Sequence, residues 1–137
     1  MRPGLQKRIL VVGGAGYIGS HMALNDAGYE VALFDNLLRG FADAVESAPL
    51  VVGDLRSASD LDACFAANRF DLVMHFAALA YVGESVNEPE LYCQNNVVGT
   101  LNLLSAMRQH GVSRFVFSST CATYGEPDGV PIQESHP

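Results

Sequence analysis

The sequence predicts an α/β fold in which a doubly wound parallel sheet carries helices on both faces. Short apolar runs rich in β-branched residues alternate along the chain with longer segments of helical pattern, and consecutive parallel strands require such crossover helices. A glycine-rich turn also follows the first apolar run directly. With 137 residues, 49% of them hydrophobic, the chain has room for one domain, which we place at residues 1–137.

The first half of the chain contains three expected strands and two expected helices. The expected strands are residues 7–12, 31–34 and 50–52. Aliphatic and β-branched side chains dominate each of these runs, as is typical of strands buried on both faces. A helix over 17–27 stops at Gly28, and a second helix over 59–68 begins with Ser59 as its N-cap.

The second half continues the alternation of strands and helices. We expect strands over 72–76 and 114–118, separated by a long helix over 90–110 that has Pro89 in its first turn and Gly111 after its end. The proline-rich tail, 125–137, has no expected regular structure. The long helix carries an apolar stripe, either core or a face for a partner helix, formed by Leu91, Val98, Leu101, Leu104 and Met107.

Composition excludes several classes of protein. The net charge is −7 and the basic residues are scattered, so we expect no nucleic-acid partner. No apolar run is long enough to span a membrane and no signal peptide is evident, so we expect a soluble, cytoplasmic protein with no membrane partner. The cysteines do not follow metal-ligand spacing, and we expect reduced thiols and no metal site at Cys64, Cys93 and Cys121.

The glycine-rich turn predicts a phosphate site. Gly13, Gly16 and Gly19 follow the first strand and open the first helix. In a Rossmann-type fold the first glycine permits the tight turn, the second lets a pyrophosphate approach the backbone, and the third lets the helix pack closely on the sheet. The helix amino end adds free N–H groups. A turn without ligand and a methyltransferase-type turn remain the alternatives.

Two carboxylates follow the next strands. Asp35 ends the second strand, 22 residues after Gly13, where a carboxylate can accept hydrogen bonds from a ribose diol and repel a 2′-phosphate. The sequence therefore favours NAD over NADP, although a turn or capping aspartate is the alternative. Asp54, after the third strand, is placed to contact adenine.

A run of hydroxyls, Ser118, Ser119 and Thr120, ends the fifth expected strand. Hydroxyls at the carboxyl end of a central strand lie at the crevice where ligands bind, and there they can order a substrate and a proton. The alternative is that they satisfy the backbone of the following turn.

These stretches together resemble the extended short-chain dehydrogenase/reductase family, and within it the 4-epimerases of UDP-glucose and UDP-galactose. The similar segments are VVGGAGYIGSH (11–21), FDNL (34–37), GDLR (53–56), HFAALAYVGESV (75–86), YCQNNVVGTLNLLSAMR (92–108) and FVFSSTCATYGEP (115–127). The resemblance implies an NAD that is held throughout turnover, receives a hydride from carbon 4 of a nucleotide sugar and returns it to the other face of the 4-keto sugar. It also implies a homodimer for the full-length enzyme.

The resemblance assigns roles to individual residues. Beyond the three glycines, it implies NAD contacts at Tyr17, Ile18, Asp35, Asn36, Leu37, Leu38, Arg39, Gly40, Asp54, Leu55, Phe76, Ala77, Ala78, Leu79, Ala80, Asn95 and Ser118. It implies that Thr120 is catalytic, hydrogen-bonding the sugar hydroxyl that loses its proton, and that Ser119 and Thr120 bind substrate.

The family's general base is a tyrosine four residues before a lysine, and this pair is absent here. Lys7 is the only lysine, and none of the five tyrosines has a lysine four residues later. We therefore expect an amino-terminal portion that lacks the substrate domain, has no turnover by itself, and exposes apolar surface through which it self-associates or is marginally stable. Alternatives are a non-catalytic NAD-binding module, a UDP-pentose 4-epimerase or a sugar-nucleotide dehydratase.

Two smaller departures concern the cofactor. Ala80 stands where many of these epimerases carry a lysine, and the first helix is two residues shorter than is usual, so we expect repacking near the cofactor.

The histidines have structural interpretations. We expect a packing or surface role for His21, with contact to a phosphate as the alternative. We expect a core or hydrogen-bonded role for His75, and a role at a helix carboxyl end for His110.

Overall fold

Five parallel strands form a single sheet in the order β3-β2-β1-β4-β5. The computed structural model describes residues 7–23, 28–45, 48–127 and 129–136. The strands are β1 (Arg8–Val12), β2 (Glu30–Asp35), β3 (Leu50–Val52), β4 (Leu72–His75) and β5 (Phe115–Phe117). All five lie within one or two residues of their predicted positions. The order reverses at β1, which confirms the doubly wound, Rossmann-like class.

The central strand β1 is buried on both faces, as its apolar sequence predicts. Leu10 and Val12 point into one hydrophobic cluster, whereas Ile9 and Val11 point into the other. Successive side chains of a strand alternate between the faces of the sheet, so one apolar run supplies both layers of the core. The side chain of Leu10 is fully buried.

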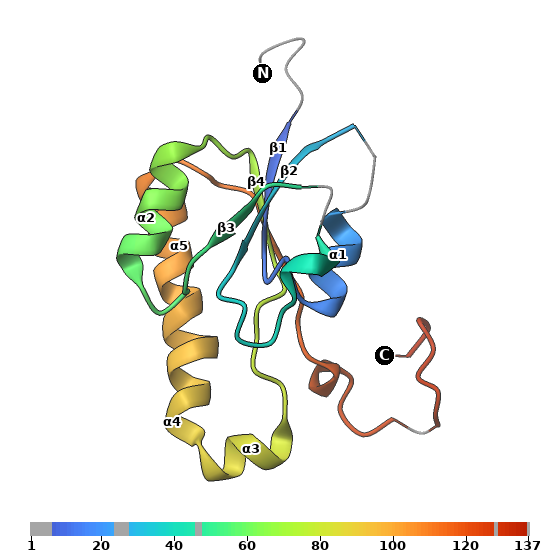
Figure 1. The fold of residues 1–137 in the computed structure, drawn as a ribbon. Helices are drawn as coiled ribbons and strands as arrows, with labels where there is room; N and C mark the ends of the chain where they lie inside the picture. The colour runs from blue at the N-terminus through green and yellow to red at the C-terminus, as the bar shows by residue number, and fades with distance from the viewer. Residues whose placement is uncertain (1–6, 24–27, 46–47, 128, 137) are drawn as a thin grey trace.

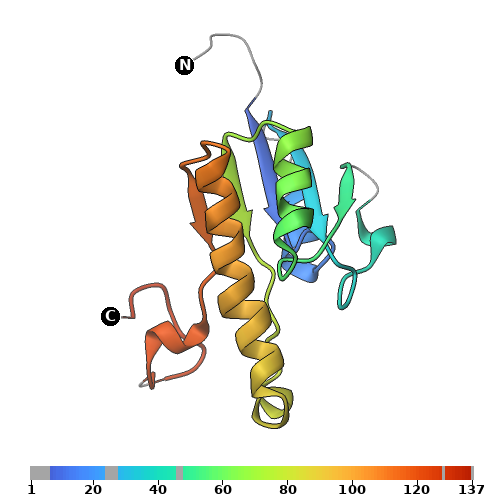
Figure 2. The same ribbon diagram turned by 90° about the vertical axis from the view of Figure 1, so that its left-hand side faces the viewer.

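Helices cover the two faces unequally (Figure 1). Helices α2 (Ala58–Ala67) and α5 (Gly99–Gln109) lie side by side on one face (Figure 2). Helix α1 (Tyr17–Ala23) covers the other face together with the short 3₁₀ turn η1 (Ala42–Ala44). The larger cluster, under α2 and α5, contains Leu61, Phe65, Leu103 and Met107.

Two helix ends differ from the prediction. Helix α2 begins at Ala58, and its N-cap is Ser57, whose Oγ accepts a hydrogen bond from the backbone N–H of Asp60. The prediction of Ser59 as the cap was wrong, because a cap serves the N–H three residues later and Ser59 already lies inside the helix. Of the predicted first helix, 17–23 is confirmed as α1 and 24–27 lies outside the described residues.

The predicted long helix is divided into three parts. It consists of α4 (Pro89–Tyr92), a π-helical segment η2 (Cys93–Val98) and α5. Pro89 occupies the first turn of α4, as predicted. A further short helix, α3 (Val82–Asn87), precedes it and was not predicted. One-turn π segments within helices are frequent at functional sites, and η2 buries Asn95.

Only part of the predicted apolar stripe belongs to the core: Met107 is buried and Leu91 is half-buried. Val98, Leu101 and Leu104 are exposed, while the buried residues of α5 are Gly99, Leu103, Ala106 and Met107.

After β5 the chain forms one 3₁₀ turn, η3 (Cys121–Tyr124), and residues 129–136 contain no helix or strand. Among the residues that the structure describes, no helix combines the length and apolar character that crossing a bilayer requires.

Candidate functional site

A cleft opens at the carboxyl ends of the central strands, where the strand order reverses. It leaves about 590 Å³ of empty space, part of which opens to solvent. Ligands of open α/β sheets bind at such a reversal point. The cleft is lined by Val12, Gly13, Gly16, Phe34, Asp35, Asn36, Leu38, Arg39, Gly40, Gly53, Leu55, Phe76, Ala77, Ala78, Leu79 and Asn95.

The glycine turn forms the floor of this cleft. Gly13 has φ of +79°, and a Cβ there would lie 2.5 Å from the backbone nitrogen of Ala77. A Cβ at Gly19 would collide with the carbonyl oxygen of Gly13. Only glycine therefore fits at these two positions. A Cβ at Gly16 would meet nothing within 4 Å except that same oxygen at 3.3 Å, so the backbone at Gly16 is open to a ligand.

Asp35 joins the glycine turn to the loop that follows β2. Its Oδ2 accepts a hydrogen bond from the N–H of Ala15 at 3.0 Å, and its Oδ1 accepts one from the N–H of Leu37 at 2.8 Å. The alternative interpretation, a turn aspartate, is thus partly realised. Each carboxylate oxygen has a second acceptor position, and the residue still lines the cleft, so it remains able to accept from a ribose hydroxyl.

The loop over residues 36–40 is held in a defined shape. Leu37 has φ of +58°, a left-handed conformation that is uncommon for leucine. The side chain of Asn36 accepts from the N–H of Leu38 at 3.0 Å. A Cβ at Gly40 would lie 2.7 Å from the Cβ of Ala15, so Gly40 permits this loop to pack directly on the glycine turn.

Asp54 is tied to its own neighbourhood. Arg56 donates to its Oδ2 at 2.6 Å, and the side-chain amide of Asn36 donates to the same oxygen at 3.1 Å. The hydrogen bond from Arg56 holds the pKa of the Asp54 carboxyl well below its usual range. Gly53 and Leu55 line the cleft, whereas Asp54 lies just outside the lining.

The loop after β4 forms the opposite wall, and Asn96 positions it. The Oδ1 of Asn96 accepts from the N–H of Leu79 at 2.9 Å, and its Nδ2 donates to the carbonyl of Leu79 at 2.9 Å. This pairing with a backbone peptide fixes Leu79 against the cleft. Asn96 was not predicted as a site residue, because nothing local in the sequence distinguishes it from Asn95.

Most predicted cofactor residues line the cleft, and some do not. Those outside the lining are Tyr17, Ile18, Gly19, Leu37, Asp54, Ala80 and Ser118. The side chains of Tyr17 and Ile18 are 84% and 55% exposed. Three further lining residues, Val12, Phe34 and Gly53, were not predicted. Their signal was available, because Val12 ends β1, Phe34 is the last residue but one of β2, and Gly53 follows β3, at the edge where ligands bind.

The three hydroxyls after β5 lie outside the cleft lining. The N–H of Ser118 donates to the carbonyl of His75 at 3.0 Å, and the hydroxyls of Ser119 and Thr123 are 3.2 Å apart. Thr120 is the N-cap of η3 and accepts from the N–H of Ala122 at 3.2 Å. The side chains of Ser119 and Thr120 thus take part in the local turn, but the hydroxyl hydrogen of Thr120 remains available to a ligand.

His75 is a buried, hydrogen-bonded core histidine, as predicted. Its Nε2 lies 3.0 Å from Oγ1 of Thr100, whose hydroxyl donates to the carbonyl of Asn96 at 2.7 Å. Nε2 therefore carries the ring proton, and Nδ1 has no partner among the described residues. Burial lowers the pKa of His75 to about 4, so the ring is neutral near pH 7.

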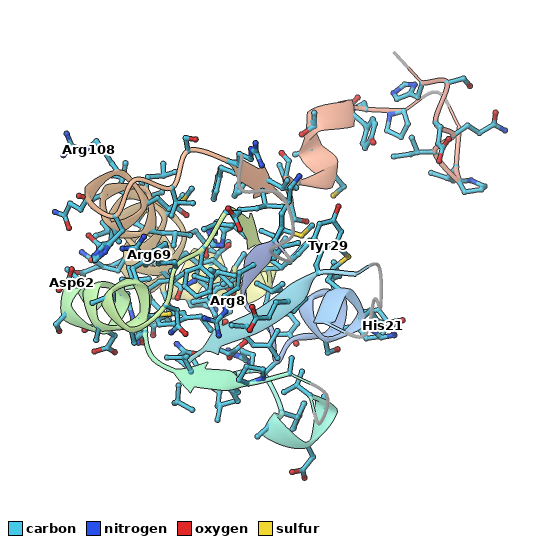
Figure 3. The ribbon with its side chains drawn as sticks, turned by 90° about the horizontal axis from the view of Figure 1, so that it is seen from above. Arg8, His21, Tyr29, Asp62, Arg69 and Arg108 are labelled. Atoms are coloured by element: carbon cyan, nitrogen blue, oxygen red, sulfur yellow. The ribbon has the colours of Figure 1, made fainter. Side chains whose placement is uncertain are left out.

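His21 has the predicted surface role. It lies on the outer side of α1, at the edge of the molecule in Figure 3, and its Nδ1 is 2.6 Å from the carbonyl of Tyr17. His110 directly follows α5 and is 2.8 Å from Asp62 on α2, so it lies at a helix carboxyl end as predicted.

A second, broad hollow opens at the opposite edge of the sheet, which faces the viewer in Figure 3. Its cations are Lys7, Arg8, Arg69 and Arg114, and Glu30 and Asp71 also line it. Helices α2 and α5 both end there. The negative ends of two helix dipoles favour cations, which accounts for this basic cluster without a ligand.

Comparison with known proteins identifies the family. The model of the NAD dependent epimerase/dehydratase family matches residues 9–137. The chain belongs to this family. The resemblance inferred from the motifs is thereby confirmed.

Several relatives in the family are UDP-sugar 4-epimerases. The UDP-glucose 4-epimerase of Rhizobium meliloti (strain 1021) is 52% identical over 130 residues, which are 93% of this chain and 40% of that protein. The probable UDP-arabinose 4-epimerase 3 of Arabidopsis thaliana is 47% identical over 141 residues, or 94% of this chain and 34% of that protein. The chain thus spans about two fifths or less of the length of these relatives.

Solved structures of the family share the fold. UDP-glucose 4-epimerase from Brucella ovis in complex with NAD is 46% identical with a TM-score of 0.84, covering 93% of this chain and 40% of that one. The UDP-glucose 4-epimerase of Thermus thermophilus, also in complex with NAD, is 44% identical with a TM-score of 0.84, covering 95% of this chain and 43% of that one.

Proposed function

We propose that this chain is the NAD-binding portion of a UDP-glucose 4-epimerase, which interconverts UDP-glucose and UDP-galactose. The observation that carries the proposal is the cleft at the reversal of strand order, where the glycine turn forms the floor and Asp35 lines the cleft beside it. The relatives named above, and the NAD in two of the related structures, support the same conclusion.

The residues present fit NAD. The backbone is open at Gly16, and the N–H groups of Tyr17 and Ile18 have no acceptor among the described residues. Such N–H groups at the start of a helix suit a diphosphate. The Asp35 carboxylate suits a ribose diol and opposes the 2′-phosphate of NADP. The remaining lining is largely apolar, as a ring system requires.

Each predicted contact belongs to one part of the proposed cofactor site. Tyr17 and Ile18 lie beside the phosphates, and Asp35 with the 36–40 loop lies beside the ribose. Asp54 and Leu55 lie by the adenine. The other half of the cofactor is held by Phe76, Ala77, Ala78, Leu79, Ala80, Asn95 and Ser118.

The proposed chemistry uses few groups of this chain. When bound, NAD would accept a hydride from carbon 4 of the sugar and return it to the opposite face of the 4-keto sugar. The hydroxyl of Thr120 donates a hydrogen bond to the sugar oxygen that changes its protonation, and Ser119 contacts the substrate. The tyrosine–lysine pair of the family's general base is absent from these 137 residues. We therefore infer that the chain by itself binds NAD without turnover, and that the nucleotide sugar and a homodimer belong to the full-length enzyme.

One alternative substrate has a specific observation in its favour. UDP-arabinose 4-epimerases are among the relatives, at 47% identity. A UDP-pentose would use the same cofactor chemistry, because the reacting carbon and its hydroxyl are the same. No residue of the cleft described here distinguishes a pentose from a hexose.

The test is a calorimetric titration of the purified chain with NAD, with NADP as the control ligand. We expect saturable binding of NAD and at least tenfold weaker binding of NADP, by roughly 1.4 kcal/mol or more. Absence of binding at millimolar NAD would overturn the proposal. A parallel assay of UDP-glucose and UDP-galactose interconversion with NAD present should detect no turnover.

A further inference from the structure

An ion pair joins the two walls of the cleft. Arg39 lies in the 36–40 loop and lines the cleft, whereas Glu84 lies in the first turn of α3, just beyond the opposite wall. Nη2 of Arg39 donates to Oε1 of Glu84 at 2.6 Å, across 45 residues of sequence. No local sequence pattern would pair these two residues.

The carboxylate of Glu84 is anchored on the protein side. The hydroxyl of Tyr92 lies 2.7 Å from Oε2 of Glu84, and Tyr92 is buried. The N–H of Tyr81 donates to the same hydroxyl at 3.0 Å. The hydrogen bond from Tyr92 lowers the pKa of Glu84 most, and the hydrogen bond and charge of Arg39 lower it further. The carboxylate is thus ionised and oriented for the arginine.

Arg39 has a second contact on the same wall. Its guanidinium lies over the ring of Tyr81, 5.1 Å from the ring centroid, in the arrangement of a cation–π pair. The loop that carries Arg39 is itself ordered by Asp35 and Asn36, which accept from backbone N–H groups two residues later. The loop cannot swing away from the cleft as a unit while Arg39 remains bound to α3.

We propose that Glu84 is a positioning residue which, through Arg39, holds the 36–40 loop against bound NAD and slows the release of the dinucleotide. The inference rests on the proposed NAD site. Slow release has a chemical purpose there, because the hydride must return to the same sugar from which it came. If the dinucleotide dissociated between the two transfers, it would carry the hydride away and the 4-keto sugar would not be reduced.

The experiment measures release directly. The full 137-residue chain is loaded with NADH, whose fluorescence reports binding, and mixed in a stopped-flow instrument with excess NAD. The variants are Arg39→Gln, Glu84→Gln, the double variant and Arg39→Lys. Arg69→Gln is the matched control, because Arg69 lies at the other edge of the sheet (Figure 3). Circular dichroism checks that each variant is folded.

The expected results separate positioning from general loosening. Each glutamine variant should release NADH about fivefold faster, the scale of an exposed ion pair, with its association rate unchanged. The double variant should match the single variants, and Arg39→Lys should fall between wild type and Arg39→Gln. Salt at about 0.5 M should accelerate release from the wild type more than from the double variant, because ions screen exposed charge pairs.

Two failures are distinguishable. A wild-type chain that binds neither NADH nor NAD overturns the proposed function, and the inference with it. A wild-type chain that binds, together with variants whose release is unchanged, overturns the inference alone. Multiplicative effects in the double variant also overturn it, because Arg39 and Glu84 would then act separately.

Discussion

Oδ2 of Asp35 accepts a hydrogen bond from the backbone N–H of Ala15 at 3.0 Å, so the last residue of β2 is joined to the glycine turn after β1. Because Oδ1 binds the N–H of Leu37, one carboxylate fastens two segments that border the cleft. The same group supplies the negative charge that we assign to cofactor selection.

Replacing Asp35 by asparagine should weaken NAD binding and reduce the preference for NAD over NADP. The amide keeps the size of the side chain but loses the charge that accepts strongly from hydroxyls and repels a 2′-phosphate. We expect a loss of NAD affinity of about tenfold, measured by calorimetry with both dinucleotides. Asp43→Asn, in the exposed turn η1, is the control. An unchanged NAD to NADP ratio would contradict the assignment.

Gly19→Ala should destabilise the fold, because the added methyl group meets the carbonyl oxygen of Gly13. Overpacking of this kind costs about 2 kcal/mol. Gly83→Ala in α3 is the matched control, since its Cβ meets no atom within 4 Å. That substitution should be neutral or stabilising by up to about 1 kcal/mol, because alanine favours helix. Urea unfolding monitored by circular dichroism compares the two, and equal effects would refute the explanation.

His75 should make stability fall as the pH falls below 6.5. Burial lowers its pKa from 6.5 to about 4, so between these values the unfolded chain binds a proton that the folded chain does not. The stabilising contribution of the neutral His75 ring is complete above pH 6.5 and disappears as the pH falls towards 4. By then the free energy of unfolding has decreased by about 3 kcal/mol.

The measurement is urea unfolding of the wild type and His75→Gln at about pH 7 and about pH 4.5. Glutamine can still donate to Thr100 but does not titrate. The carboxylates titrate alike in both proteins, so their effect cancels in the comparison. Between the two pH values the free energy of unfolding should therefore fall by about 2 kcal/mol more in the wild type than in the variant. Identical losses would show that His75 is not the titrating group.

Ser57→Ala should cost about 1 kcal/mol of stability, because it removes the N-cap of α2. Ser59→Ala should have little effect, since its side chain contributes only a hydroxyl contact to Ser57 at 3.0 Å. Thermal unfolding of the two variants is a direct comparison. A larger effect at Ser59 would restore the original prediction of the cap.

Charges placed on the outer side of α5 should reduce self-association. Leu101 and Leu104 are 60% and 40% exposed, and Val97 and Val98 lie exposed just before them. Contiguous apolar surface of this kind favours association. We expect Leu101→Lys combined with Leu104→Lys to shift size-exclusion elution towards the monomer, whereas Gln109→Lys should not. A wild-type chain that is already monomeric would remove the basis for this prediction.

The strands and the glycine turn could be predicted because their signals are local. An apolar run such as the one at β1 identifies a buried strand without reference to the rest of the chain. Gly13, Gly16 and Gly19 mark a turn whose tight backbone approaches favour glycine, and the residues at strand ends identify the edge where a cleft opens. Family likeness then indicated which further residues would border it.

The features that escaped prediction depend on partners far away in sequence. Helix α3 contains Gly83 and has little helical propensity. The start of the helix is held by hydrogen bonds of Tyr92 with Tyr81 and Glu84, and not by a local sequence signal. The contact between Arg39 and Glu84 exists only once β2 and β4 are neighbours of β1.

The pairing of β1 with β4 also determines how fast the protein can fold. Residues in register across these strands, such as Ile9 and Leu72, are as far apart in sequence as Arg8 and Asp71, which are separated by 63 residues. The central ladder therefore requires closure of a long loop before any of its hydrogen bonds form. Topologies dominated by distant pairings fold slowly, so during synthesis β1 and β2 must wait, with their apolar faces open, until β4 has left the ribosome.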